Sequence, residues 1–201
     1  NPLVFTSEMP QEDLMFQLVA IHAANPKFAT IHPPVSSFRM ILGQMSPTEE
    51  AFYDEVMDDL VNNPDHGSIR VIDTREFTTF GSVMQRTVRE NAIDEVDMLW
   101  VDYITRLPVD TKYRSMGLTE GRNETIADAK RFAMSFNNGE GLAVCSPFQV
   151  NREGYKKAKT SEGRMDKTAL AQYNAAEKEA DIISYSFFDE EEAATSEPKV
   201  G

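Results

Sequence analysis

One aspartate stands directly after an apolar run that is typical of a buried strand. The residues from Met98 to Val101 are apolar, and Asp102 follows them. Such a run suits a strand buried on both faces of a parallel sheet, with Trp100 packed in the core. The acid would end the strand, where open α/β sheets bind ligands and nucleotide-hydrolysing proteins hold Mg²⁺ through an aspartate. An acid that merely ends a strand fits the same residues, so the neighbouring motifs must decide.

Two further polar residues follow apolar stretches. Glu8 comes soon after residues 3–5, and Gln149 comes just past residues 141–146. Because the carboxyl ends of parallel strands share one edge of a sheet, we expect these two side chains to lie near Asp102. ATP hydrolysis requires an acid for a metal, a second acid to activate water and an amide to sense the γ-phosphate. The ordered set therefore favours a nucleotide site over three unrelated strand ends.

The elements that must position these residues alternate along the chain. Strands are predicted at residues 3–7, 69–73, 98–102, 141–146 and 182–187. Helices are predicted from Pro10 onward, over 47–61, from Thr78 or Thr79 to Glu90, and over 123–138. Strands separated by helices imply βαβ units with right-handed crossovers. We therefore expect one α/β domain over residues 1–201, built on a mostly parallel sheet.

Charge is spread unevenly over this chain of 201 residues, whose net charge is −13. The acidic balance argues against a broad nucleic-acid-binding face. The stretch 152–167 is nevertheless locally basic and contains Lys156, Lys157, Lys159 and Arg164. A basic stretch on an acidic body is compatible with gripping a phosphate backbone, and a solvated loop explains it almost equally well.

Cysteine and histidine usage argue against two kinds of site. The single cysteine, Cys145, lies in an apolar run, which indicates a buried thiol, no disulfide framework and a reducing, cytoplasmic setting. His22, His32 and His66 lie in separate segments without ligand spacing, so the sequence does not indicate a histidine metal site. No apolar run approaches the roughly 20 residues that span a bilayer, and no membrane partner is expected.

Four segments of the chain together resemble the DnaB-type replicative helicases. They are Thr6-Ser7-Glu8-Met9-Pro10, Leu99-Trp100-Val101-Asp102-Tyr103-Ile104, Ser146-Pro147-Phe148-Gln149-Val150-Asn151-Arg152 and Glu177-Lys178-Glu179-Ala180-Asp181-Ile182-Ile183. Their order and spacing agree with that family over residues 3–189. The resemblance implies a RecA-like ATPase fold, which is a three-layer sandwich of a mostly parallel sheet flanked by helices.

The resemblance also implies roles for the three polar residues. Glu8 would be the general base that activates the attacking water, and Asp102 would hold Mg²⁺, partly through water. Gln149 would sense the γ-phosphate of ATP and link it to the DNA-binding loops. Members of the family form hexameric rings that move along single-stranded DNA with ATP bound between subunits. A helicase loader or a primase is then a further expected partner.

The DNA-binding loops of such a ring face its central channel. Here they would include the basic residues Lys156, Lys157 and Lys159, together with Arg164 and the stretch 169–174. That stretch departs from the family, because Ala171 and Asn174 stand where an arginine and a glycine are usual.

The phosphate-binding loop of the family, G-x-x-x-x-G-K-[ST], does not occur in this sequence. We expect it upstream of Leu3 and the family's arginine finger beyond Gly201, so that the chain is an inactive fragment of the ATPase domain. Two alternatives are a RecA-like recombinase or other ATPase that does not unwind DNA, and a catalytically silent RecA-like scaffold for assembly. The joint presence of Glu8, Asp102 and Gln149 argues against the silent scaffold.

Overall fold

Four parallel strands form the centre of the chain in a computed structural model, which describes residues 1–29, 36–74, 79–149, 152–161 and 174–185. The strands are β1 (Pro2–Thr6), β2 (Arg70–Asp73), β3 (Met98–Asp102) and β4 (Ala143–Cys145). They lie side by side in the order β2-β1-β3-β4, and every pairing is parallel. The predicted α/β fold with a mostly parallel sheet is confirmed.

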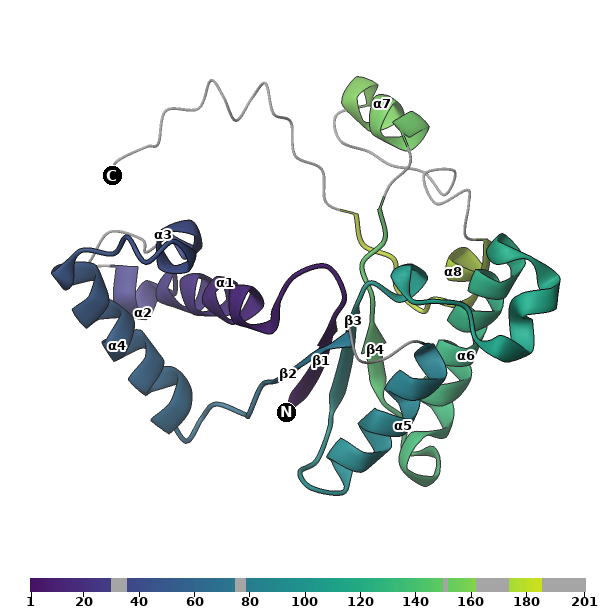
Figure 1. Cartoon of the computed structure of the whole chain (residues 1–201), viewed down its shortest axis with the longest axis horizontal. Helices are drawn as coiled ribbons and strands as arrows, with labels where there is room; N and C mark the ends of the chain where they lie inside the picture. Colours follow the sequence, from purple (N-terminus) through teal and green to yellow (C-terminus); the bar gives the residue numbers. More distant parts are fainter. Residues whose placement is uncertain (30–35, 75–78, 150–151, 162–173, 186–201) are drawn as a thin grey trace.

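Helices lie on both sides of this sheet (Figure 1). One group contains α1 (Gln11–Ala23), α2 (Pro26–Ala29), α3 (Ser37–Ile41) and α4 (Pro47–Asn62). On the other side lie α5 (Phe80–Asn91) and α6 (Leu118–Gly139), with α8 (Asn174–Glu179) against α6. Two 3₁₀ helices, η2 (Ile104–Arg106) and η3 (Thr111–Met116), connect β3 to α6, and α7 (Arg152–Thr160) follows β4.

Local sequence signals explain where several helices begin and end. At the start of α4, Ser46 and Glu49 form a reciprocal capping box around Pro47. Thr79 caps α5, as predicted, by accepting a hydrogen bond from the Ser82 amide. The predicted start of α6 at residue 123 is wrong, because this helix already begins after Gly117, whose φ of +89° favours glycine.

The prediction that β3 is buried on both faces is wrong. Leu99 and Val101 are buried, whereas Met98 is 36% and Trp100 is 40% exposed. Side chains alternate between the two faces of a strand, and α5 and α6 pack on the face that carries Leu99. On the opposite face α1 lies against β2, which leaves the indole of Trp100 outside the packed core.

The described residues form two separate apolar clusters. The larger one joins the sheet to α5 and α6 and includes Leu3, Phe5 and Leu99. The smaller one lies among α1, α3 and α4 and includes Val19 and Val56. Each cluster removes its own apolar surface from water, so the helical group around α1 has an apolar core separate from that of the sheet.

Two further expectations are corrected. Of the strand predicted at 182–187, residues 182–185 are described and form no strand, and Ile182 is 83% exposed. An extended segment needs a neighbouring ladder, and among the described residues none pairs with it. Cys145 is only partly buried, since β4 lies at the edge of the sheet.

No described helix is long and apolar enough to cross a membrane.

Candidate active site

The carboxyl ends of the central strands are tied to one another by hydrogen bonds. The backbone amide and the hydroxyl of Ser7 both donate to the carbonyl oxygen of Asp102, at 2.9 and 2.7 Å. The hydroxyl of Ser146 donates to the carbonyl oxygen of Val101 at 2.8 Å and accepts from the Ile104 amide at 2.9 Å. The ends of β1, β3 and β4 are thereby held together, and they fix the backbone on which the site residues stand.

Glu8 and Asp102 lie at this edge as predicted. Thr6 pairs with Asp102 in the β1–β3 ladder, and Glu8 follows two residues later in the chain. Burial raises the pKa of Asp102, and the negative charge of Glu8 raises it further. Arg106 opposes both effects, and the net pKa of Asp102 stays above its ordinary value.

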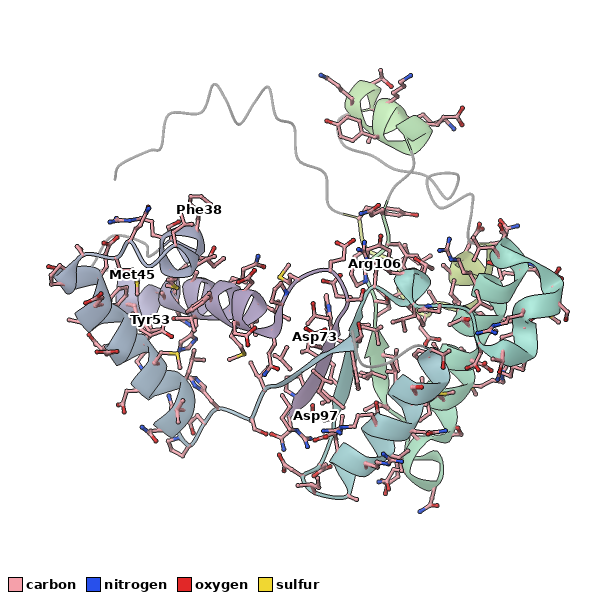
Figure 2. The ribbon with its side chains drawn as sticks, viewed as in Figure 1. Phe38, Met45, Tyr53, Asp73, Asp97 and Arg106 are labelled. Carbon is pink, nitrogen blue, oxygen red and sulfur yellow. The ribbon has the colours of Figure 1, made fainter. Side chains whose placement is uncertain are left out.

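Arg106 is a site residue that the sequence motifs do not single out. Its guanidinium donates to Oε1 of Glu8 at 2.6 Å, and both side chains remain partly exposed. The 3₁₀ turn η2 positions it, because the amide of Arg106 bonds back to the carbonyl of Tyr103. Figure 2 shows Arg106 beside the carboxyl ends of the strands. The sequence feature that could have indicated Arg106 is its position shortly after Asp102. A single tight turn after the strand is enough to bring that side chain back to the edge of the sheet.

The donor set at this edge fits a hard divalent cation. Asp102 is a partly buried carboxylate whose charge is disfavoured by its surroundings, and Glu8 adds a second negative oxygen group nearby. Mg²⁺ prefers one or two carboxylates together with water, and it would relieve this repulsion. The sequence lacks the glycine-rich loop that would hold a triphosphate beside such an ion.

The remaining predicted residues are distributed around this edge. Gln149 lies beyond β4, a short way past the anchored Ser146, and is exposed. Lys156, Lys157 and Lys159 are exposed on α7, which stands apart from the sheet on its carboxyl-end side (Figure 1). Arg164 and residues 169–173 lie outside the described residues.

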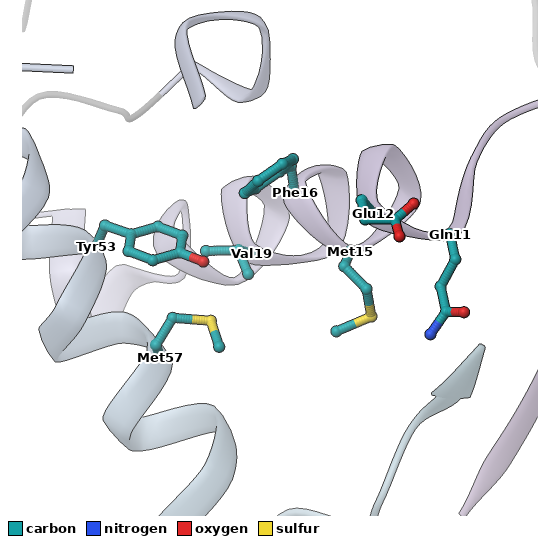
Figure 3. A pocket seen from close by; sticks show the side chains of 7 residues that line it. All are labelled: Gln11, Glu12, Met15, Phe16, Val19, Tyr53 and Met57. Carbon is teal, nitrogen blue, oxygen red and sulfur yellow. The ribbon is translucent and has the colours of Figure 1, made fainter. Parts of the chain in front are cut away.

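A separate pocket lies in the helical group between α1 and α4 (Figure 3). Its lining is mainly apolar and consists of Gln11, Glu12, Met15, Phe16, Val19, Tyr53 and Met57. None of the predicted site residues that the structure describes lines it, so the pocket is distinct from the edge that carries Glu8 and Asp102.

Comparison with solved structures identifies the fold of this chain. No family model and no curated protein matches the chain. Among solved structures, a DnaB-like replicative helicase, described together with its interactions with primase, aligns with a TM-score of 0.73 over 98% of this chain. This chain has the fold of a DnaB-like helicase. The two sequences are 14% identical, and the match covers 42% of the solved chain. The expected RecA-like architecture is thus confirmed at the level of the helicase fold.

Proposed function

We propose that the carboxyl edge of this sheet belongs to the ATPase site of a replicative DNA helicase. ATP hydrolysis there would drive movement along single-stranded DNA and unwinding of the duplex. The observation that carries the proposal is the placement of Glu8 and Asp102 on neighbouring strand ends of a helicase-like fold. Ligand sites of open parallel sheets lie at this edge, and two acids with different surroundings suit a metal ligand and a base.

In this proposal the two acids have separate roles. Asp102 holds Mg²⁺, whose charge stabilises the phosphate oxygens of ATP during hydrolysis. Glu8 orients the attacking water and accepts its proton. In this proposal Arg106 holds the carboxylate in place through Oε1, and Oε2 of Glu8 accepts the proton from the water. Gln149 would report the γ-phosphate to the segments that contact DNA.

The wider assembly follows from the same proposal. The chain would act within a longer protein that supplies the phosphate-binding loop and assembles as a hexameric ring with ATP between subunits. The exposed lysines of α7 would face single-stranded DNA. The solved helicase is described with its interactions with primase, and we extend a primase or loader partner to the full-length protein as part of the proposal.

Substitution of Glu8 tests the proposed base. In the full-length protein, Glu8→Gln keeps the size of the side chain but removes its basicity. We expect ATP turnover to fall by about 10²- to 10⁴-fold while ATP binding is retained. Steady-state hydrolysis and equilibrium nucleotide binding, measured on the same preparation, separate the two effects.

Glu12→Gln provides the matched control, because Glu12 is an exposed acid in the next segment of the chain. Its turnover should equal that of the wild type. Unchanged turnover in Glu8→Gln would refute the assignment of the base. ATPase activity without strand separation on a forked substrate would instead indicate an ATPase that does not unwind DNA.

A further inference from the structure

Three potential metal ligands meet in the helical group, away from the edge of the sheet. His22 lies in the last turn of α1, Asp59 near the end of α4, and His66 in the connection from α4 to β2. One ligand atom from each residue lies within 4.8 Å of the other two. We propose that these residues bind a borderline divalent transition-metal ion such as Zn²⁺.

The distances suit a small ion with little rearrangement. Nε2 of His22 lies 2.9 Å from Oδ2 of Asp59, and the rings of His22 and His66 have centroids 5.1 Å apart. Ligand atoms of a tetrahedral zinc site are about 3.3 Å from one another, since each lies about 2.0 Å from the ion. Closing the cluster therefore requires shifts of at most about 1.5 Å. The exposed His66 can make such a shift without disturbing the core.

The carboxylate of Asp59 is oriented by hydrogen bonds to both of its oxygens. Its Oδ1 accepts hydrogen bonds from Lys27 and from the side chain of Asn63, whereas Oδ2 faces His22. A metal ion between Nε2 of His22 and Oδ2 would replace the hydrogen bond between them, while the hydrogen bonds to Oδ1 would keep the carboxylate oriented, as is typical of a metal ligand.

A tight turn presents His66 to the other two residues. The amide of His66 bonds to the carbonyl of Asn63 at 3.1 Å, with Pro64 at the second position of the turn. The side chain of Asn63 also accepts a hydrogen bond from the Asp65 amide at 3.0 Å. Asn63 therefore couples the shape of this turn to the orientation of Asp59.

The ligand types select the class of metal. Two imidazoles and one carboxylate suit Zn²⁺ and its neighbours in the first transition series, whereas Mg²⁺ prefers oxygen ligands and water. The ammonium group of Lys27 lies on the same carboxylate and opposes the approach of a cation. Zn²⁺ bound here would join the end of α1 to the connection between α4 and β2.

Zn²⁺ titration of the whole chain by calorimetry, with Mg²⁺ present in large excess over the protein, tests the site. We expect binding in the wild type that Mg²⁺ does not displace. His66→Asn should weaken it by at least about tenfold, because the loss even of an outer partner costs that much. Lys27→Met should strengthen it, because a competing cation is removed. Far-ultraviolet circular dichroism checks that each variant remains folded.

Asp65→Asn is the matched control, since Asp65 is the exposed neighbour of His66 but lies outside the cluster. It should bind Zn²⁺ as the wild type does. The proposal is overturned if the wild type takes up no Zn²⁺ at micromolar concentrations, or if folded His66→Asn binds as tightly as the wild type. Neither result bears on the ATPase proposal, because the cluster shares no residue with the edge of the sheet.

Discussion

Arg106 shows how a residue without a motif enters the candidate active site. Glu8 and Asp102 can be predicted from the sequence because each follows an apolar strand, and parallel strands bring their carboxyl ends together. Arg106 could not be predicted in the same way. Its place depends on the 3₁₀ turn after β3, and a sequence pattern does not fix whether that turn brings the side chain back to Glu8.

Replacing Arg106 separates positioning of the base from its chemistry. In the full-length protein, Arg106→Gln removes the charge that holds Glu8 at 2.6 Å. We expect kcat for ATP hydrolysis to fall by about tenfold, with KM unchanged. Removal of the base itself should cost more, about 10²-fold or greater. Arg106→Lys should restore part of kcat. A rise in KM alone would show that Arg106 binds nucleotide rather than positioning Glu8.

At the scale of elements, a charged network joins η3 to α6. Asp128 of α6 accepts hydrogen bonds from Tyr113 at 2.8 Å and from Arg131 at 2.6 Å, and it forms an ion pair with Lys112 at 2.7 Å. Burial raises the pKa of Asp128, but these three partners outweigh burial and leave it below the ordinary value. The network thus stabilises the link between β3 and α6 as long as the carboxylate is charged.

Acid should weaken this link in a defined direction. Because the folded pKa of Asp128 lies below its unfolded value of about 3.9, its contribution is complete above that pH and is lost as the pH falls through the folded pKa. Asp128→Asn should lower the free energy of unfolding by about 2 kcal/mol at neutral pH and reduce its loss in acid. Urea unfolding across this pH range measures both.

Asp54→Asn is the control for that comparison, because Asp54 is an exposed acid on α4. Its stability and pH dependence should match the wild type. If Asp128→Asn is equally stable at neutral pH, the network contributes nothing to the fold.

The exposed lysines of α7 allow a test of DNA binding. Lys156, Lys157 and Lys159 are exposed on it, so replacing all three by Ala should weaken single-stranded DNA binding by the full-length protein. The slope of log affinity against log salt is negative, and each lost phosphate contact makes it less steep by about 0.7. Replacing the exposed Arg89 and Lys178 by Ala serves as the control. An unchanged salt slope in the triple variant would show that α7 does not contact DNA.

At the scale of the whole molecule, the alternation of strands and helices was enough to predict the parallel sheet. It was not enough to predict which surfaces would be covered, because burial of β3 depends on where α1, α5 and α6 pack. Likewise, His22 and His66 are distant in sequence and become neighbours only when α1 packs against α4. Tertiary packing therefore decides features that local patterns leave open.

The open face of β3 also gives the molecule an optical reporter. Trp100 is the only tryptophan in the chain, and the residue is 40% exposed on that face. Indole emission moves to shorter wavelength when water is removed from the ring. The intrinsic fluorescence of this protein therefore reports, without any label, whether another surface has covered the sheet beside Asp102.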